Sequence, residues 1–270
     1  MPFLPDRAGS TTGRPRRALV AIAWALAFAW GPACGAPADH EIDALRARDV
    51  AAADPHRGVA LLRALREQAK ARQHAQVRLS LDEALCRVLT DLDAAQALAA
   101  ADAGLEASGG TPTEAAREAW LRLRACRAGM LLELGLLPEG QAELERLFEA
   151  TARPADAGVH ALVQLERGVH RSRSGQLELA QTDLLRACET LRSTGPSRDL
   201  ILCLGHLANH YRRVGDADEA LKMLVPLRDQ ARQRGETYDD AIYTFGIAQV
   251  QQQLKHWDEA TEAYRQSSAA

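Results

Sequence analysis

Cysteine is the residue type in this chain best suited to covalent chemistry. Cys86, Cys126, Cys188 and Cys203 contain no C-x-x-C pair, so their spacing lacks a zinc signature. Cys188 and Cys203 lie almost symmetrically about the turn near Pro196. Antiparallel helices on either side of that turn would bring the two thiols to a similar height. The sequence therefore suggests a disulfide between them. The alternative is two small buried residues packed between helices.

Histidine is the second type that could support chemistry. His206 and His210 are four residues apart, a spacing that can bind a metal from one face of a helix. No glutamate stands between them in an H-E-x-x-H arrangement, and no third ligand is near, so we predict no metal site. We expect His206 to face a groove and His210 to lie nearer its rim. No glycine-rich phosphate loop, nucleophile elbow or carboxylate pair is present either, so we predict no cofactor and no enzyme activity.

A helical hairpin that recurs along the chain must position these side chains. The stretch Ile201–Leu227 predicts a helix, a tight turn at Gly215-Asp216 and a second helix that runs back. Four kinds of position recur in steps of 40 residues. The small residue that opens the second helix recurs as Gly140, Ala180, Ala220 and Ala260. The small residue inside the first helix recurs as Ala128, Gly168, Ala208 and Ala248. The turn residue recurs as Gly135, Gly175, Gly215 and Lys255. The large buried residue of the second helix recurs as Leu144, Leu184, Leu224 and Tyr264. Such self-similarity indicates a repeat architecture.

Composition and packing physics favour an all-α fold built from these hairpins. The chain is 47% hydrophobic and 26% charged, as in folded soluble proteins, and it is rich in Ala and Leu. No segment alternates polar and apolar residues with a period of two, so we expect almost no strand. Small residues let paired helices approach to about 8–10 Å. Because one hairpin cannot bury its own apolar face, neighbouring hairpins must stack.

The hairpin resembles a tetratricopeptide repeat. The resemblance rests on Leu207-Ala208, Tyr211, Val214-Gly215-Asp216, Ala220-Leu221 and Leu224, which stand at the signature spacings of the family. Family units usually run about 34 residues, so a step of 40 implies longer helices or longer loops. The resemblance implies a right-handed superhelical solenoid of about six antiparallel helix pairs, in one domain over residues 39–270. We place the units at residues 41–72, 78–107, 112–151, 155–192, 197–233 and 237–268.

The resemblance also implies where a ligand would bind. In arrays of this family the first helix of each pair lines a concave surface, and the ligand contacts come from particular positions on it. Those positions here are Glu166, Arg173, His206, Asn209, Arg212, Arg213, Phe245, Gln249, Gln252 and Gln253. Arg173 and Arg213 stand in one column, one repeat apart, and could pair with carboxylates. We therefore expect a protein or peptide partner, acidic in character. An ordinary solvated helix face is the alternative.

The N-terminal segment is typical of a secretory signal. Residues 1–38 carry four arginines, then the uncharged apolar run Ala18–Trp30, then the small-x-small site Ala36-Pro37-Ala38. A lipoprotein signal ending at Cys34 and an uncleaved membrane anchor are the alternatives. Export to the periplasm would place the chain in an oxidising compartment. Removal of residues 1–38 shifts the net charge from −3 to −6, which argues against general nucleic-acid binding.

Together these features predict an exported, non-enzymatic scaffold that binds a protein or peptide in its concave groove. The alternative is the periplasmic sensor portion of a truncated membrane signalling protein, because arrays resembling this one precede diguanylate cyclase domains in bacterial sensors. Contact with a membrane is expected only through an uncleaved signal or a missing C-terminal segment.

Overall fold

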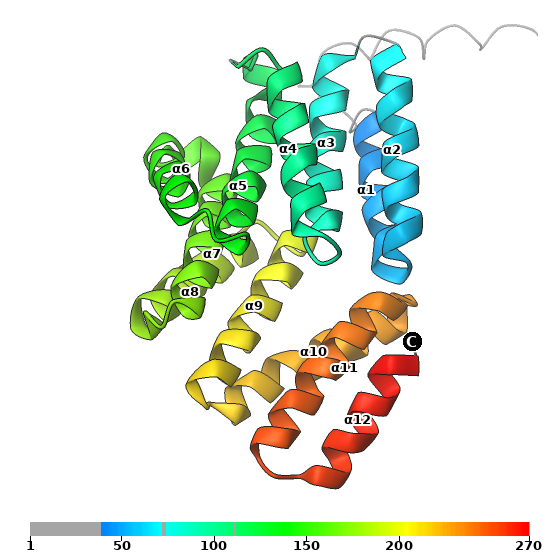
Figure 1. Cartoon of the computed structure of the whole chain (residues 1–270), viewed down its shortest axis with the longest axis vertical. Helices are drawn as coiled ribbons and strands as arrows, with labels where there is room; N and C mark the ends of the chain where they lie inside the picture. The colour runs from blue at the N-terminus through cyan, green and yellow to red at the C-terminus, as the bar shows by residue number, and fades with distance from the viewer. Residues whose placement is uncertain (1–38, 72–73, 111, 270) are drawn as a thin grey trace, which may run out of the picture. The chain divides into compact units, whose positions relative to one another are not determined.

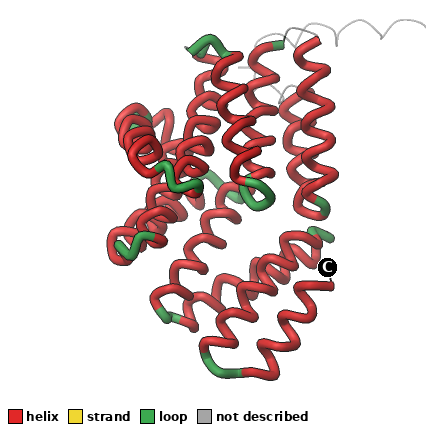
Figure 2. Tube along the Cα trace, in the orientation of Figure 1, coloured by secondary structure: helices red, strands yellow, loops and turns green. Residues whose placement is uncertain are grey.

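The computed structural model describes residues 39–71, 74–110 and 112–269. The secretory signal expected in residues 1–38 lies outside the described residues. Within them all regular secondary structure is helical, with twelve α-helices and two short 3₁₀ turns (Figures 1 and 2). The α-helices are α1 (Asp39–Ala53), α2 (Pro55–Ala71), α3 (Ala75–Leu89), α4 (Ala94–Ala107), α5 (Arg117–Glu133), α6 (Leu137–Ala150), α7 (Ala157–Arg173), α8 (Leu177–Ser193), α9 (Arg198–Val214), α10 (Ala217–Arg234), α11 (Thr237–Gln253) and α12 (Trp257–Ala269). The second predicted unit began at residue 78, whereas α3 begins at Ala75.

The helices form six antiparallel pairs that stack in chain order, from α1 in blue to α12 in red (Figure 1). Each odd-numbered helix also contacts the next odd-numbered helix, so α1, α3, α5, α7, α9 and α11 form one continuous layer. This arrangement is the predicted all-α solenoid. The odd-numbered helices are the ones that can present side chains to a shared concave surface.

The small residues of the repeat sit where helices meet most closely. Ala180 and Ala220 are fully buried, and Ala260 is almost so. A β-carbon added at Gly168 would come within 2.8 Å of the Leu184 side chain, so α7 and α8 can pack at this distance only without one. The close approach predicted from the sequence is therefore confirmed at these positions.

The turn residue of each late repeat adopts the left-handed backbone conformation. The φ angles are +78° at Gly135, +82° at Gly175 and +86° at Gly215, and each turn leads from the first helix of a pair into the second. The fourth member of the column, Lys255, has φ of +63° although it carries a side chain. The backbone geometry is thus repeated even where glycine is replaced.

Two disulfides join neighbouring helices. Cys188 of α8 is bonded to Cys203 of α9, with an S–S distance of 2.16 Å. Cys86 of α3 is bonded to Cys126 of α5, with an S–S distance of 2.08 Å. The second bond was not anticipated, although Cys86 and Cys126 are one repeat of 40 residues apart and so occupy the same position on consecutive first helices. In the described part of the chain, no helix is both long enough and apolar enough to cross a bilayer.

Candidate functional site

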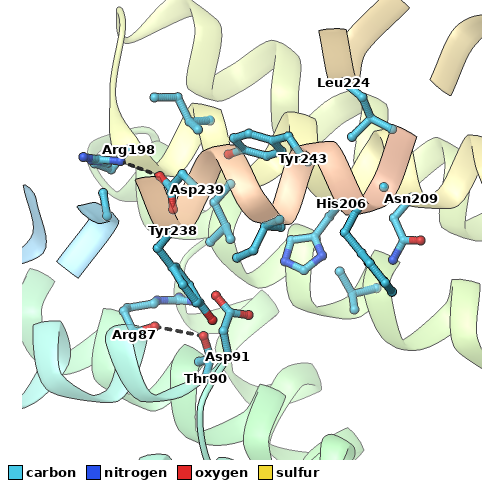
Figure 3. A pocket seen from close by; sticks show the side chains of 18 of the residues that line it. Arg87, Thr90, Asp91, Arg198, His206, Asn209, Leu224, Tyr238, Asp239 and Tyr243 are labelled. Atoms are coloured by element: carbon cyan, nitrogen blue, oxygen red, sulfur yellow. Dashed lines mark hydrogen bonds and ion pairs between the residues drawn. The ribbon is translucent and has the colours of Figure 1, made fainter. Parts of the chain in front are cut away.

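The concave layer encloses a cavity of about 520 Å³. Residues from α1, α2, α3, α7, α9, α10 and α11 line it, so its walls come from both ends of the stacked pairs. Figure 3 shows Tyr238 of α11 reaching toward Thr90 and Asp91 at the end of α3, while His206 of α9 points into the space beside them. The arrangement is that of a pocket between helices, a common place for ligands to bind.

Helix α9 supplies more of the lining than any other element. Its start is fixed by Ser197, whose side-chain oxygen accepts a hydrogen bond from the Leu200 backbone amide at 3.2 Å. His206, Asn209 and Arg213 recur at helical spacing and all line the cavity. On the other side of the helix, Leu207, Ala208 and Tyr211 are buried in the core. The amphipathic pattern of α9 therefore turns its polar side chains toward the cavity.

Three arginines on one side of the cavity, Arg173, Arg212 and Arg213, have few carboxylate partners among the described residues. Arg212 donates to the side-chain oxygen of Asn209 at 2.8 and 3.2 Å, and Arg173 contacts Glu133. Arg213 has no ion-pair partner among the described residues. Burial and then the neighbouring Arg213 lower the pKa values of both Arg173 and Arg212, and Asp91 partly offsets this effect at Arg173. Cations that depress one another's pKa in this way favour an anionic ligand.

His206 adds a neutral polar ring to this surface. Desolvation, followed by the charges of Arg173 and Arg87, lowers the pKa of His206 to about 4. The imidazole is therefore uncharged at pH 7, and it can donate one hydrogen bond and accept another. The predicted position of His206 in the groove agrees with the cavity lining. His210 was expected near the rim, and that expectation is wrong. Its side chain is 1% exposed, and its Nδ1 lies 2.9 Å from the Ser172 hydroxyl.

A chain of alternating charges runs beside the cavity and ties five helices together. Arg87 of α3 bonds to Glu166 of α7 at 2.6 Å and lies 3.6 Å from Glu83. Arg122 of α5 lies 3.4 Å from Glu83 and donates to both Asp199 oxygens, at 2.8 and 3.0 Å. Arg48 of α1 reaches Asp199 of α9 at 3.4 Å. Listed so that each residue contacts the next, the series is Glu166, Arg87, Glu83, Arg122, Asp199 and Arg48.

The electrostatics of this series keep its members charged. Burial opposes ionisation of Asp199, but Arg122 and Arg48 outweigh it and lower the pKa of that carboxyl. Burial likewise opposes the charge on Arg122, yet Glu83 and Asp199 raise its pKa. Only Arg87 and Arg48 of the series line the cavity. The series therefore borders the cavity through its arginines and keeps the matching carboxylates behind them.

Glu166 belongs to this series and not to the cavity surface. The sequence placed it among the ligand contacts, but its carboxylate is bound to Arg87 and packs against Gly129 of α5. Gln252 and Gln253 also lie outside the cavity lining. Gln252 instead accepts a hydrogen bond from the Tyr264 hydroxyl of α12 at 2.6 Å. Glu166 and Gln252 are bonded to side chains of neighbouring helices, and a ligand contact at these three residues stays a prediction. The remaining predicted residues that line the cavity are Arg173, His206, Asn209, Arg212, Arg213, Phe245 and Gln249.

The first helix closes the cavity against the last pairs. Arg198 at the start of α9 bonds to Glu236 at 2.7 Å and to Asp239 at 2.9 Å, and it reaches Asp49 of α1 at 3.3 Å. The Thr237 hydroxyl donates to the Ala53 carbonyl at 2.8 Å. Helix α1 thus contacts both α9 and α11, far along the sequence. Sequence reasoning missed Arg48, Arg87 and Tyr238 as lining residues, since a repeat pattern predicts neighbouring contacts and not this closure.

Residues 199–270 match the family model described as "Tetratricopeptide repeat". This match covers α9 to α12 and supports tetratricopeptide repeats in that part of the chain. A solved structure, BtubC (BKLC) from P. vanneervenii, resembles this chain with a TM-score of 0.53 and 14% identity, over 86% of this chain and 88% of that one. At that identity the likeness shows the fold alone. Among curated proteins, none matches the chain. Tetratricopeptide arrays typically use their concave surfaces to hold other proteins, which makes an interaction scaffold the function suggested by the family.

Proposed function

We propose that this protein is an exported tetratricopeptide scaffold that binds an acidic segment of a protein partner at its concave surface. The observation that carries the proposal is the arginine group on α7 and α9. Arg213 has no ion-pair partner among the described residues, and Arg212 is held only by a neutral amide there. A partner carboxylate would relieve the repulsion among these arginines by charge-assisted hydrogen bonds.

An exposed strip beside these arginines extends the contact surface. Phe245 is 47% exposed, and Asn209 is also exposed. The Phe245 ring packs edge-on against Tyr264, with ring centroids 5.5 Å apart. An exposed aromatic ring held in place by a neighbour loses little freedom on binding, so it suits an interface. A partner with an apolar residue next to its carboxylates would therefore fit this surface best.

The disulfides support the export part of the proposal. All four cysteines of the described residues are paired, and structural disulfides persist in oxidising compartments. The sequence of residues 1–38, in which arginines are followed by an apolar run, supports the same location. A periplasmic site of action would unite both features.

The experiment compares the capture of partners by three forms of the full chain. Wild type, the double variant Arg212→Ala/Arg213→Ala and the control Arg186→Ala are immobilised and exposed to periplasmic extract, and bound proteins are quantified by mass spectrometry. Arg186 is an exposed arginine on α8, outside the cavity. We expect a specific partner to bind the double variant about tenfold less or weaker still, and the control normally. Equal capture by wild type and the double variant would refute the assignment.

A second candidate function is the sensor portion of a membrane signalling protein such as a diguanylate cyclase. The cavity favours it, because sensors need a place for a ligand. Reading the gene beyond codon 270 tests this candidate. A membrane helix and a cyclase domain in frame would support it, and a stop codon directly after Ala270 would contradict it.

A further inference from the structure

We propose that the inner cavity binds a small organic anion with an apolar body, such as a medium-chain carboxylate. This ligand goes beyond the protein partner proposed above, although both would contact Arg213. The proposal rests on the size and closure of the cavity, on two unpartnered buried nitrogens, on its excess of arginine and on its apolar walls.

The size and closure of the cavity favour a compact ligand. A volume of about 520 Å³ lies within the range of roughly 300–1,000 Å³ that small-molecule pockets occupy. Helix α1 closes one side through Arg198, Asp49 and Thr237, and Arg87 and Arg48 of the ion series border another. Seven helices contribute to the lining, so a compact molecule could contact several of them at once.

Two buried nitrogens at the cavity lack hydrogen-bond partners among the described residues. The Nη2 of Arg87 has none, although the residue is only 8% exposed and its Nη1 is bound to Glu166. The Nε2 of His210 has none either, in a side chain that is 1% exposed. A buried polar atom without a partner costs about 1–3 kcal/mol, so a ligand atom that accepts from Arg87 would be favoured. Both residues line the cavity.

The charge balance of the lining selects an anion. The lining contains six arginines and two carboxylates, Asp91 and Asp239. Asp239 is already bound to Arg198 at 2.9 Å. Asp91 is exposed and lies beside Tyr238 (Figure 3), and Arg213 has no ion-pair partner among the described residues. An anionic group on the ligand would complete this balance.

The apolar lining selects a ligand with a hydrocarbon or aromatic body. Side chains from four helices provide this surface: Val88, Val169, Ile201, Leu202 and Ile242. Burial of apolar ligand surface against them contributes roughly 25 cal/mol for each Å² removed from water. The cavity therefore has a cationic part and an apolar part, which matches an amphiphilic acid better than a bare inorganic ion.

Isothermal titration calorimetry on the full, oxidised chain tests this proposal with three probes. Octanoate combines the charge and the body, acetate has only the charge, and octanol has only the body. We expect octanoate to bind at one site, and acetate and octanol to bind at least about tenfold more weakly. Absence of octanoate binding, or equal affinity for octanol, would overturn the proposal.

Variants then locate the bound charge. Arg173→Gln should weaken octanoate binding about tenfold, Arg173→Lys should retain part of it, and the surface control Arg186→Gln should leave it unchanged. Thermal unfolding of each variant checks that it is folded. Binding that is equally strong in wild type and Arg173→Gln would place the ligand elsewhere and refute the site. Partner capture is a separate readout, so loss of one function would not imply loss of the other.

Discussion

At the scale of single residues, Asp82 shows how far the interior departs from an ordinary apolar core. Its side chain is fully buried between α2 and α4, with Arg66 in contact and Arg78 at 3.8 Å. Burial raises the pKa of Asp82 to about 6, and the two arginines only partly oppose this effect. The folded protein therefore binds a proton at Asp82 more tightly than the unfolded chain, whose value is 3.8.

The sign of the resulting pH dependence follows from linkage. Because the folded pKa is the higher one, Asp82 favours folding fully below about pH 4, and this contribution is lost as the pH rises through about 6. The variant Asp82→Asn cannot titrate at this position. We expect its unfolding free energy, relative to wild type, to fall by about 1–3 kcal/mol between pH 7 and pH 4. Urea denaturation of both proteins across this range measures it, and a constant difference would contradict the assignment.

Residue types in the groove could be predicted, but their partners could not. The family spacing correctly indicated that His206, Asn209 and Arg213 share one face of a helix, since that follows from helical periodicity alone. Glu166 stands at an equivalent position, yet Arg87 from another pair takes its carboxylate. A contact between residues 79 positions apart depends on how pairs curve around each other, and no local pattern encodes it.

At the scale of elements, the turn between paired helices depends on its left-handed residue. Gly215 has φ of +86°, and an added β-carbon would meet no other atom, so backbone strain alone opposes a side chain there. We expect Gly215→Ala to lower the unfolding free energy by about 1 kcal/mol.

Gly158 is the matched control for this prediction. It lies within α7 in ordinary helical conformation, also with open space around its α-carbon. Gly158→Ala should be neutral or stabilising by up to about 1 kcal/mol, because alanine has the higher helix propensity. Guanidinium denaturation of oxidised protein compares the two variants. Equal effects of both substitutions would show that the turn carries no special strain.

The disulfides give a second prediction about the elements. Peptide mapping of unreduced protein should find Cys86 linked to Cys126 and Cys188 linked to Cys203, with all four becoming alkylated only after reduction. Loss of either bond in a double alanine variant should cost about 2–4 kcal/mol, slightly more for the 40-residue loop than for the 15-residue loop. Free thiols at these positions in protein from an oxidising compartment would contradict the pairing.

Helix pairs and turns were accessible from the sequence because their determinants are local. The roles of Ala180, Ala220 and the glycines at the turn position depend on contacts and backbone geometry within one hairpin. The bond between Cys86 and Cys126 was overlooked, although the 40-residue period contained the signal. Equivalent positions on consecutive first helices are adjacent in a stacked array. The separation of the two cysteines by one repeat could therefore have indicated that they are in contact.

At the scale of the described helical array, closure by α1 determines what kind of site the concave surface becomes. A solenoid in which each pair meets only its neighbours would leave an open trough. Here α1 meets α9 and α11 through Arg198, Asp49, Thr237 and Ala53. The same contacts bring Arg48 into the cavity lining and complete the ion series at Asp199.

Hydrogen exchange across this closure tests the account most directly. Arg198→Ala removes the bonds from α9 to Asp49 of α1 and Asp239 of α11, and Arg228→Ala on α10 serves as a control away from the closure. Exchange is followed by mass spectrometry in the last turn of α1, residues 49–54, where the Asp54 amide bonds to the Val50 carbonyl at 2.8 Å. The account predicts strong protection there in wild type and the control, and clearly faster exchange in Arg198→Ala. Exchange in this turn that is rapid in wild type, or unaffected by Arg198→Ala, would contradict a closed cavity.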